Sequence, residues 1–571
     1  MKNNIFACNS ELHLGSALQA LLAALLIIPV PLLHAAGPEF PGAGSILQQI
    51  KSAQPPIPAN KERGLRIEGR HEGTPPASAP FLIKAIRVTG NTLFGRDTLH
   101  ALVADAEGRS LSLAELGARA ANITDFYHRH GYPLARAFIP AQTIRDGSVE
   151  IRVLEARYNA IVLDNHSEVN ESLLLSTLSP IQRGDAVYQD LLDHQLLLLS
   201  DIPGITIDAT LKPGETAGTS DLLVAANPTP PVGGIISLDN YGTRESGRVR
   251  LSGTAQMLNL LHYGDILSVT GLTAGTNMNY GRLGYEMLLN DRGTRLGASY
   301  SALHYRLGNT LSSLDAHGTA QVGSLWLKHP LVRRQSVNVY GQLQYDQLQL
   351  RDDIDTSAVA THRHIGSWTL SLNGDWRDSL LYGAVSSWNF GLSSGRVGFD
   401  NAGAQLADAA TAKAEGNFTK WNLGLSRLQN LSPQNSLYLA FSRQWSNGNL
   451  DQAEKVAVGG IYTVRAYDMG ITSGDAVTLG TVEFRRNLRA NWGGEWQLVA
   501  FVDSAHVTLN KEAWAAGTNS LTLSGAGVGL NWAGPNQWSA RTYIATPIGS
   551  RPNQLASTPS AHAWLEIRKI F

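Results

Sequence analysis

Cysteine is almost absent from this 571-residue chain, which contains only Cys8. That residue lies in an N-terminal stretch with the features of a targeting segment, so the mature chain is expected to have no thiol at all. This excludes a disulfide scaffold, thiol catalysis and a cysteine-ligated metal site.

The chain also lacks an excess of charge of either sign. Lys and Arg total 46 against 47 Asp and Glu, for a formal net charge of −1, and no block of like charges occurs. Nucleic acids and other polyanions attract proteins through basic patches, so no nucleic-acid partner is expected.

Long apolar runs are missing after the N-terminus. Residues 1–36 open with Lys2, continue through an apolar run over 17–33 and end in Ala35 and Ala36, which is the layout of a cleaved signal peptide. The alternative, an uncleaved membrane anchor, is disfavoured by prolines in the second half of the run. No later run could span a bilayer as a helix, so any membrane crossing must use strands.

Residues 37–80 are rich in proline and poor in bulky side chains, which predicts a semi-extended linker. Within it, Ile46, Leu47 and Ile50 fall on one side of a short amphipathic helix over residues 45–52, with Ser45 as its cap. A helix this short must dock against something to be stable, and the alternative is a disordered tail.

Two small α+β units follow, over residues 81–156 and 157–228. The first is predicted to contain a strand at 81–89, a short helix capped by Asp97, a longer helix at 112–130, and strands at 134–139 and 149–154 joined by a turn at Asp146 and Gly147. The second repeats this order, with strands at 160–163, 205–211 and 222–226 and helices at 170–177 and 187–199, after a period of about 75 residues. Each unit resembles a POTRA domain, a periplasmic module that binds extended client segments at a sheet edge.

Tryptophan is absent from the first half of the chain, and all twelve tryptophans lie at or beyond Trp326. From residue 229 onward the segments alternate in polarity; Trp421, Leu423 and Leu425 fall on one face, as do Trp496, Leu498, Ala500 and Val502. Alternation over residues 229–571, with aromatic residues at the ends of the apolar face, predicts a transmembrane antiparallel β-barrel of about 16 strands enclosing a channel. A soluble β-sandwich also alternates, but the length of the alternating region favours the barrel.

The last residues form an alternating strand that ends in Phe571. Ala563, Leu565, Ile567 and Phe571 lie on its apolar face, and Lys569 interrupts that face. We interpret this end as an outer-membrane assembly signal.

One serine matches a catalytic motif by its letters. Ser393 lies in a Gly-x-Ser-x-Gly sequence, but the nucleophile elbow needs a following helix in a parallel sheet, and here an alternating strand ends. The motif therefore does not predict a hydrolase.

Other candidate sites are equally weak. The pairs His128/His130 and His362/His364 have no Asp or Glu arranged around them in sequence as a metal site would need, and the glycines at 525–529 read as close packing within a strand. We expect neither catalysis nor a cofactor nor a metal ion.

A glycine-bounded stretch over residues 459–475 contains a single arginine, Arg465, with Tyr462 and Tyr467 on either side. Most loop arginines are simply solvated, and the stretch alone leaves that alternative open. Asp503 falls on the polar, inward face of a later strand, where it could meet the loop.

Taken together, the leader, linker helix, two POTRA-like units and barrel resemble a TpsB two-partner secretion transporter of the Omp85 superfamily. The loop motif of that family is Val-Arg-Gly-Tyr, which Val464, Arg465 and Tyr467 match while Ala466 replaces the glycine. Its second motif is Phe-x-Asp-x-Gly, which Phe501 and Asp503 match while Ala505 replaces the glycine.

The resemblance implies that the loop folds into the barrel and that Arg465 pairs with Asp503. It also implies that the linker helix plugs the pore and that the POTRA-like units bind a secreted TpsA-type exoprotein of the adhesin or haemolysin class. Outer-membrane lipids and the barrel-assembly machinery are the other implied partners. If the lumen is filled with water, the ion pair should contribute about 0–1 kcal/mol to stability, as a surface ion pair does.

Three other functions remain open at this stage. An Omp85-type factor that assembles other outer-membrane proteins would share the architecture, but two POTRA-like units and the N-terminal helix favour secretion. An outer-membrane lipid hydrolase would depend on Ser393, and a passive porin would not need periplasmic modules.

Overall fold

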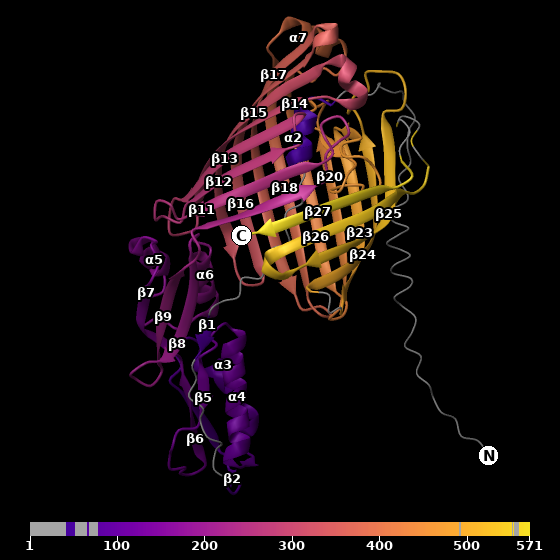
Figure 1. Cartoon of the computed structure of the whole chain (residues 1–571). Helices are drawn as coiled ribbons and strands as arrows, with labels where there is room; N and C mark the ends of the chain where they lie inside the picture. Colours follow the sequence, from indigo (N-terminus) through magenta and orange to yellow (C-terminus); the bar gives the residue numbers. More distant parts are fainter. Residues whose placement is uncertain are drawn as a thin grey trace, which may run out of the picture.

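The computed structural model describes residues 41–51, 65–67, 78–489, 493–550, 552, 555 and 559–571. Two small domains stack beneath a large barrel, and helix α2 (Ala43–Lys51) lies inside that barrel (Figure 1). The predicted signal peptide and most of the predicted linker lie outside the described residues. No helix in the described part of the chain has the length and apolar character needed to cross a membrane.

The first small domain packs helix α4 (Leu113–Arg129) against a three-stranded sheet in the order β3-β6-β5. Ser112 and Glu115 form a reciprocal capping box at the start of α4. Its remaining elements are β2 (Phe81–Leu82), β3 (Ala85–Thr89), α3 (Arg96–His100), η1 (Ala104–Ala106), β4 (Ser110–Leu111), β5 (Arg136–Phe138) and β6 (Ser148–Leu154). The prediction that Asp97 caps the short helix is wrong, because α3 begins one residue earlier and Gly95 occupies the cap position.

The second domain has the sheet order β1-β8-β9-β7 with helices α5 and α6. The elements are β7 (Arg157–Asn165), α5 (Glu171–Leu178), α6 (Gln189–Ser200), β8 (Ile205–Pro213) and β9 (Thr219–Pro228). Strand β1 (Leu65–Ile67) comes from the linker and pairs in parallel with β8. The linker was predicted to be semi-extended rather than folded, so this paired strand is a feature that sequence reasoning missed.

Helix α6 connects this domain to the barrel. Arg333, at the end of β15, holds Asp201 just beyond α6 with Nε–Oδ2 and Nη2–Oδ1 distances of 2.6 and 3.0 Å. Arg334 lies 3.2 Å from Asp190 in the first turn of α6. The second domain is therefore held at the end of the barrel where β15 and β16 turn.

A closed antiparallel barrel follows, as predicted from the alternation. Its sixteen strands, counted over the described residues, are β10 (Val232–Asp239), β11 (Arg250–Leu258), β12 (Ile266–Thr273), β13 (Met278–Leu288), β14 (Arg295–Arg306), β15 (Ala316–Arg333), β16 (Val337–Ile354), β17 (Val359–Asp378), β18 (Ala384–Phe399), β19 (Gly416–Asn430), β20 (Asn435–Ser446), β23 (Ala476–Leu488), β24 (Glu495–Thr508), β25 (Ser520–Ala533), β26 (Trp538–Pro547) and β27 (His562–Ile570). Short segments outside the wall are η2 (Asn309–Leu314), η3 (Asp355–Ser357), α7 (Ala402–Ala410) and η4 (Pro535–Gln537).

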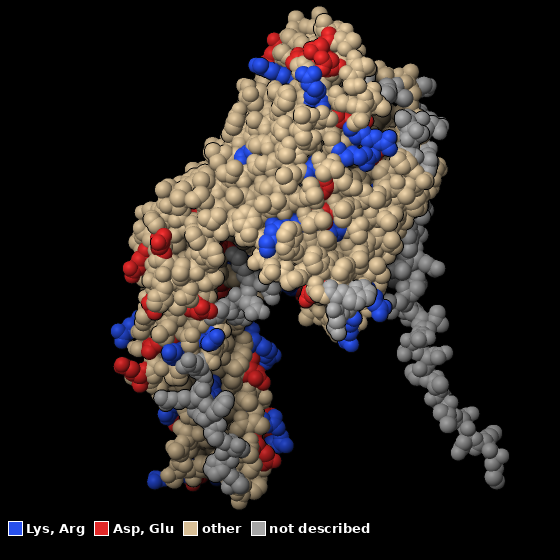
Figure 2. Space-filling model, viewed as in Figure 1, with Lys and Arg blue, Asp and Glu red and all other residues tan. Residues whose placement is uncertain are grey.

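The two faces of the wall differ as the alternation predicts. Leu498 and Val502 in β24 are 45% and 46% exposed, whereas Asp503, on the opposite face, is fully buried. Figure 2 shows charged side chains on the two lower domains and at the upper tip, with a mostly uncharged surface over much of the barrel wall between them. An apolar outer face of this kind is what a lipid-facing barrel requires.

Aromatic pairs mark both ends of the wall. Trp421 and Trp445 lie directly opposite each other with ring centroids 6.0 Å apart, near the ends of β19 and β20 that face away from the small domains. Trp496 and Trp532 form a second pair, also with centroids 6.0 Å apart, at the other end of β24 and β25. This spacing fits the two aromatic girdles of a membrane barrel.

The barrel closes where β27 pairs with β10. Phe571 exchanges backbone hydrogen bonds with Gly234 just beyond that pairing, and its side chain is 54% exposed. Lys569 interrupts the apolar face, but its ammonium group lies 5.6 Å from the ring centroid of Trp538 and donates to the Asn536 carbonyl. A lysine that extends toward the interface in this way is compatible with a lipid-facing strand.

Candidate functional site

The long connection between β20 and β23 folds back into the barrel. Its ends pair as β21 (Val456–Val458) and β22 (Thr472–Gly474), and between them the chain makes a tight loop. Gly459 and Gly460 have φ values of 103° and 97°, a left-handed conformation that favours glycine. The loop tip, residues 459–470, is thereby turned toward the barrel wall.

Arg465 lies at the centre of this loop and meets two carboxylates from the wall. Its Nε donates to Asp503 Oδ2 at 2.8 Å and its Nη2 donates to Asp503 Oδ1 at 2.7 Å, a bidentate pairing. Its Nη1 donates to Glu483 Oε1 at 2.7 Å. The sequence had suggested the pairing with Asp503 but not the one with Glu483, which lies on the neighbouring strand β23.

Aromatic residues enclose the same guanidinium group. The Arg465 Cζ atom lies 3.4 Å from the ring centroid of Phe501, close enough for a strong cation–π contact. Trp564 donates through Nε1 to the Arg465 carbonyl at 2.7 Å, which also ties the loop to the last strand. Both motif residues of β24, Phe501 and Asp503, therefore contact the loop arginine.

This ion pair is not solvated, contrary to the surface-like expectation from the sequence. Arg465 is only 5% exposed and Asp503 is fully buried. Burial tends to lower the pKa of the guanidinium, but hydrogen bonding and the charges of Asp503 and Glu483 outweigh it and raise that pKa above its usual value. The arginine is held permanently charged, and removing it would leave buried carboxylates without a counter-charge.

Alanine replaces the glycine of the loop motif without strain. Ala466 is fully buried and is not among the described residues with positive φ. A Cβ atom added to Gly525 on the facing strand β25 would lie 2.3 Å from the Ala466 Cβ. The extra methyl group in the loop is therefore accommodated by a glycine in the wall, and Ala505 likewise lies buried within its strand.

The neighbouring loop residues are also fixed. Val464 and Tyr467 are buried in an apolar cluster with Phe501. Asp468 lies 3.4 Å from His562 and 3.0 Å from Arg248, and these contacts, His562 foremost, outweigh burial and hold the pKa of its carboxyl below the usual value. The loop is thus tied both to the connection between β10 and β11 and to strand β27.

Helix α2 occupies the lumen beside the loop. Ile46 and Leu47 are each 1% exposed and pack into an apolar cluster of the wall, and Ile50 packs at its margin. The helix begins at Ala43, so the prediction that Ser45 caps it is wrong; Ser45 instead donates to the Gly42 carbonyl.

The group that receives the start of α2 is Asp352, near the outer end of β16. Its Oδ1 accepts from the Ala43 amide at 2.6 Å and from the Tyr305 hydroxyl at 2.6 Å. Arg363 bridges Asp352 and Asp451 at 2.8 and 2.7 Å. Sequence reasoning missed these residues because each is an ordinary strand or loop residue until the register brings them together.

Helix α2 and the loop touch each other. The Gln49 side chain lies against Gly470, where an added Cβ would be 2.5 Å from Gln49 Nε2. Gln48 donates to the carbonyl of Ala453, which precedes β21. Gly44 packs on Ala453, where a Cβ would be 2.8 Å from the neighbouring atoms.

The serine and the histidines that the sequence analysis considered as candidate sites lie in ordinary structural contacts. Ser393 hydrogen-bonds to Thr369 at 2.8 Å within the barrel wall. His362 and His364 each pair with a separate carboxylate, at 3.0 Å from Asp353 and 2.6 Å from Asp400 respectively. Within the described residues, no cluster of three or more His, Cys, Asp or Glu side chains could hold a metal ion.

Comparison with known proteins gives the same architecture. The model of the family "Haemolysin secretion/activation protein ShlB/FhaC/HecB" matches residues 218–532, and the ShlB-type POTRA domain matches residues 81–156. The heme/hemopexin transporter protein HuxB of Haemophilus influenzae (strain 86-028NP) is 26% identical over 484 residues, covering 83% of this chain and 84% of that protein. The outer membrane transporter CdiB of Dickeya dadantii is 24% identical over 500 residues, covering 82% and 83%.

Among solved structures, CdiB from Escherichia coli matches with a TM-score of 0.68 and 21% identity over 88% of this chain and 93% of that one. BamA from Haemophilus ducreyi lacking POTRA domains 1–3 matches with a TM-score of 0.51 and 15% identity over 86% and 100%. These two likenesses concern the fold alone. The family match spans more than half of the chain, which therefore belongs to the ShlB/FhaC/HecB family of TpsB transporters, with its barrel in the outer membrane and its POTRA domains in the periplasm.

Proposed function

We propose that this protein is the outer-membrane pore through which one large partner exoprotein passes from the periplasm to the cell surface. The proposal rests on the two segments of the chain that lie inside the barrel lumen. A sixteen-stranded barrel is wide enough for a channel, and here two separable elements, α2 and the loop at 459–475, occupy it. Transport requires at least one of them to move.

Helix α2 is the element we expect to leave. It has only nine residues and is joined to the rest of the chain through the linker, so its stability depends on the contacts it makes in the barrel. The loop, by contrast, is attached at both ends and is fixed by the buried pairing of Arg465 with Asp503 and Glu483. We assign the plug role to Ile46, Leu47 and Ile50.

The linker strand β1 suggests how the client could release the plug. It pairs with the β8 edge of the second POTRA domain, the type of edge at which extended peptides add a strand. A client segment that replaced β1 there would free the linker that leads to α2. Recognition of the client and opening of the pore would then be coupled through one short strand.

The chain offers no nucleotide motif, and we infer that folding of the client outside the cell drives transport. The client is a TpsA-type exoprotein of the adhesin or haemolysin class, or a carrier of a nutrient; the relative HuxB is named as a heme/hemopexin transporter. Outer-membrane lipids surround the barrel, and we assign Phe571 to recognition by the barrel-assembly machinery that inserts it.

Single-channel conductance in planar bilayers tests the plug. Ile46→Asp places a charge in an apolar contact that is 1% exposed and should raise the open probability, whereas Ile46→Leu should leave it near the wild-type value. Equal conductance of all three proteins would eliminate the plug role. Export of the client by the same variants then separates plug release from transport.

An assembly factor for other outer-membrane proteins is the second candidate, because the barrel also resembles BamA in fold. Two POTRA domains and the N-terminal helix favour secretion. Deletion of the gene should abolish secretion of one exoprotein and leave the levels of other outer-membrane proteins unchanged; a general loss of these proteins would favour the assembly role. A lipase assay on Ser393→Ala tests the remaining hydrolase alternative.

A further inference from the structure

A row of residues with no large side chain crosses the outer face of the barrel wall. Gly253 in β11 lies directly opposite Gly271 in β12, which lies opposite Gly281 in β13, which in turn lies opposite Ala302 in β14. The next residue along β14, Leu303, points into the lumen and packs in the cluster that holds the plug helix. Because side chains alternate along a strand, the small residues point outward.

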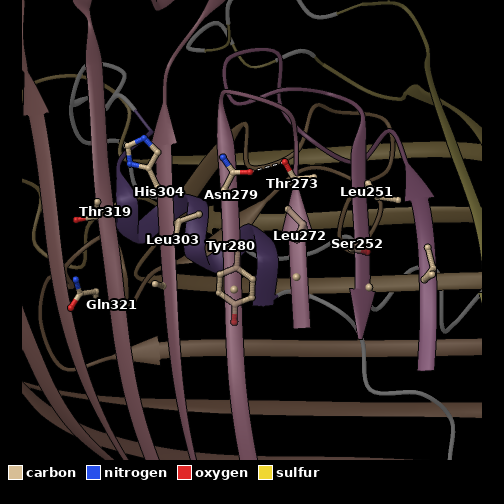
Figure 3. Close-up of a pocket in the computed structure, with 15 residues that line it drawn as sticks. Leu251, Ser252, Leu272, Thr273, Asn279, Tyr280, Leu303, His304, Thr319 and Gln321 are labelled. Carbon is tan, nitrogen blue, oxygen red and sulfur yellow. Dashed lines mark hydrogen bonds between the residues drawn. The ribbon is translucent and has the colours of Figure 1, made fainter. Parts of the chain in front are cut away.

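The row forms the floor of a groove with a volume of about 770 Å³. A Cβ atom added to Gly271 or Gly281 would meet nothing within 4 Å, so the groove is open above both residues. The three inter-strand spacings from β11 to β14 give the floor a length of about 14 Å. Figure 3 shows this region with α2 behind the strands, so the wall between the groove and the plug is a single sheet.

A polar row borders the groove on the side away from the POTRA domains. Thr273 ends β12 and donates to Asn279 at 2.7 Å, the contact drawn as a dashed line in Figure 3. The register continues this row from strand to strand through Thr273, Asn279, His304, Thr319 and Arg351. Arg351 is an exposed cation, and the register places His362 directly opposite it.

An apolar row borders the groove on the side toward the POTRA domains. Val269, Leu283 and Tyr300 lie opposite one another in register and are 52%, 54% and 54% exposed. The groove thus lies where the lipid-facing surface changes from apolar to polar. Since the POTRA domains are periplasmic, this boundary belongs to the outer leaflet.

We propose that the groove binds one acyl chain of a phosphorylated outer-leaflet glycolipid, lipopolysaccharide, whose polar head lies along the row from Thr273 to Arg351. Lipid is the material that faces the outward residues of a membrane-spanning wall, and the groove continues the apolar band without interruption. Lipid tails are as apolar as the wall, so selectivity here comes from the fit of a chain into the groove and from polar contacts at its rim. Arg351 supplies the positive charge that a phosphate group requires.

A groove-filling variant tests this site. Gly271→Leu with Gly281→Leu places two side chains in the open space and should leave the barrel intact, because neither residue has a positive φ. Gly323→Leu is the matched control: Gly323 is also on the outer face, opposite Tyr300, with nothing within 4 Å of its added Cβ. Heat-dependent migration on gels verifies that each full-length variant is folded.

The readout is native mass spectrometry of the full-length proteins after extraction from outer membranes. Wild type and the Gly323→Leu control should retain a glycolipid that the double variant loses by tenfold or more, and Arg351→Ala should retain less of it than wild type. Electron cryomicroscopy in nanodiscs containing lipopolysaccharide should show elongated density above Gly271 and Gly281 in wild type only. Equal glycolipid retention by the double variant and wild type, or retention of phospholipid alone, would overturn the proposal.

Discussion

Replacing Arg465 should detach the lumen loop while the barrel still assembles. The guanidinium makes two hydrogen bonds to Asp503 and one to Glu483, and Asp503 is fully buried. Removing one partner of a buried ion pair typically costs about 3–5 kcal/mol, because the other charge remains buried without compensation. In Arg465→Ala the loss destabilises the docked conformation of the loop relative to an undocked one, because in the undocked conformation water can reach the carboxylates.

Hydrogen exchange measures this effect directly. Since about 1.4 kcal/mol corresponds to a tenfold change, amides in residues 459–470 should exchange about 100-fold faster or more in Arg465→Ala. Arg465→Lys keeps the charge but not the bidentate geometry and should give an intermediate rate. Arg541→Ala, at an exposed position of β26, is the control, and its loop amides should exchange at the wild-type rate.

Export of the client is the functional readout for the same variants. We expect Arg465→Ala to abolish export while the protein remains in the outer membrane in normal amounts. If the loop amides of Arg465→Ala exchanged at the wild-type rate, the free-energy cost inferred for removing the arginine would be refuted. Wild-type export would refute the functional role of the arginine.

Three further outcomes follow from contacts in the lumen and in the first POTRA domain. Deletion of residues 37–54 should raise channel conductance in planar bilayers, and unchanged conductance would argue against a plug. Gly525→Ala should loosen the loop because its Cβ would lie 2.3 Å from that of Ala466, and adding Ala466→Gly should restore slow amide exchange. In the first POTRA domain, burial raises the pKa of Glu155, but hydrogen bonds from Thr92, Tyr127 and Leu93 outweigh it and lower that pKa overall. Its stabilising contribution is therefore present above the unfolded pKa of about 4.3 and lost as pH falls through the lower folded value. The protection factor of the Thr92 amide, which is the observed exchange rate corrected for the intrinsic rate at each pH, should therefore fall in acid in the wild type and be low at every pH in Glu155→Gln.

Periodicity in the sequence was enough to predict the architecture. Alternating polarity after residue 229 predicted a barrel because a wall between lipid and an aqueous lumen needs opposite properties on its two faces. The apolar side of α2 could also be predicted from the sequence, since Ile46, Leu47 and Ile50 recur at helical spacing. Local pattern determined less about where helices begin: Asp97 and Ser45 both have the chemistry of a cap, yet neither is one.

The composition of the site depended on contacts that no local pattern encodes. The sequence by itself determined that Arg465 lies in a glycine-bounded loop and that Asp503 faces inward. Only the tertiary structure decided that Glu483 shares the guanidinium, that Gly525 makes room for Ala466, and that Asp352 receives the start of α2. Strand register around a closed barrel brings together residues far apart in the chain, and a shift of one residue would turn each of those side chains to the opposite face.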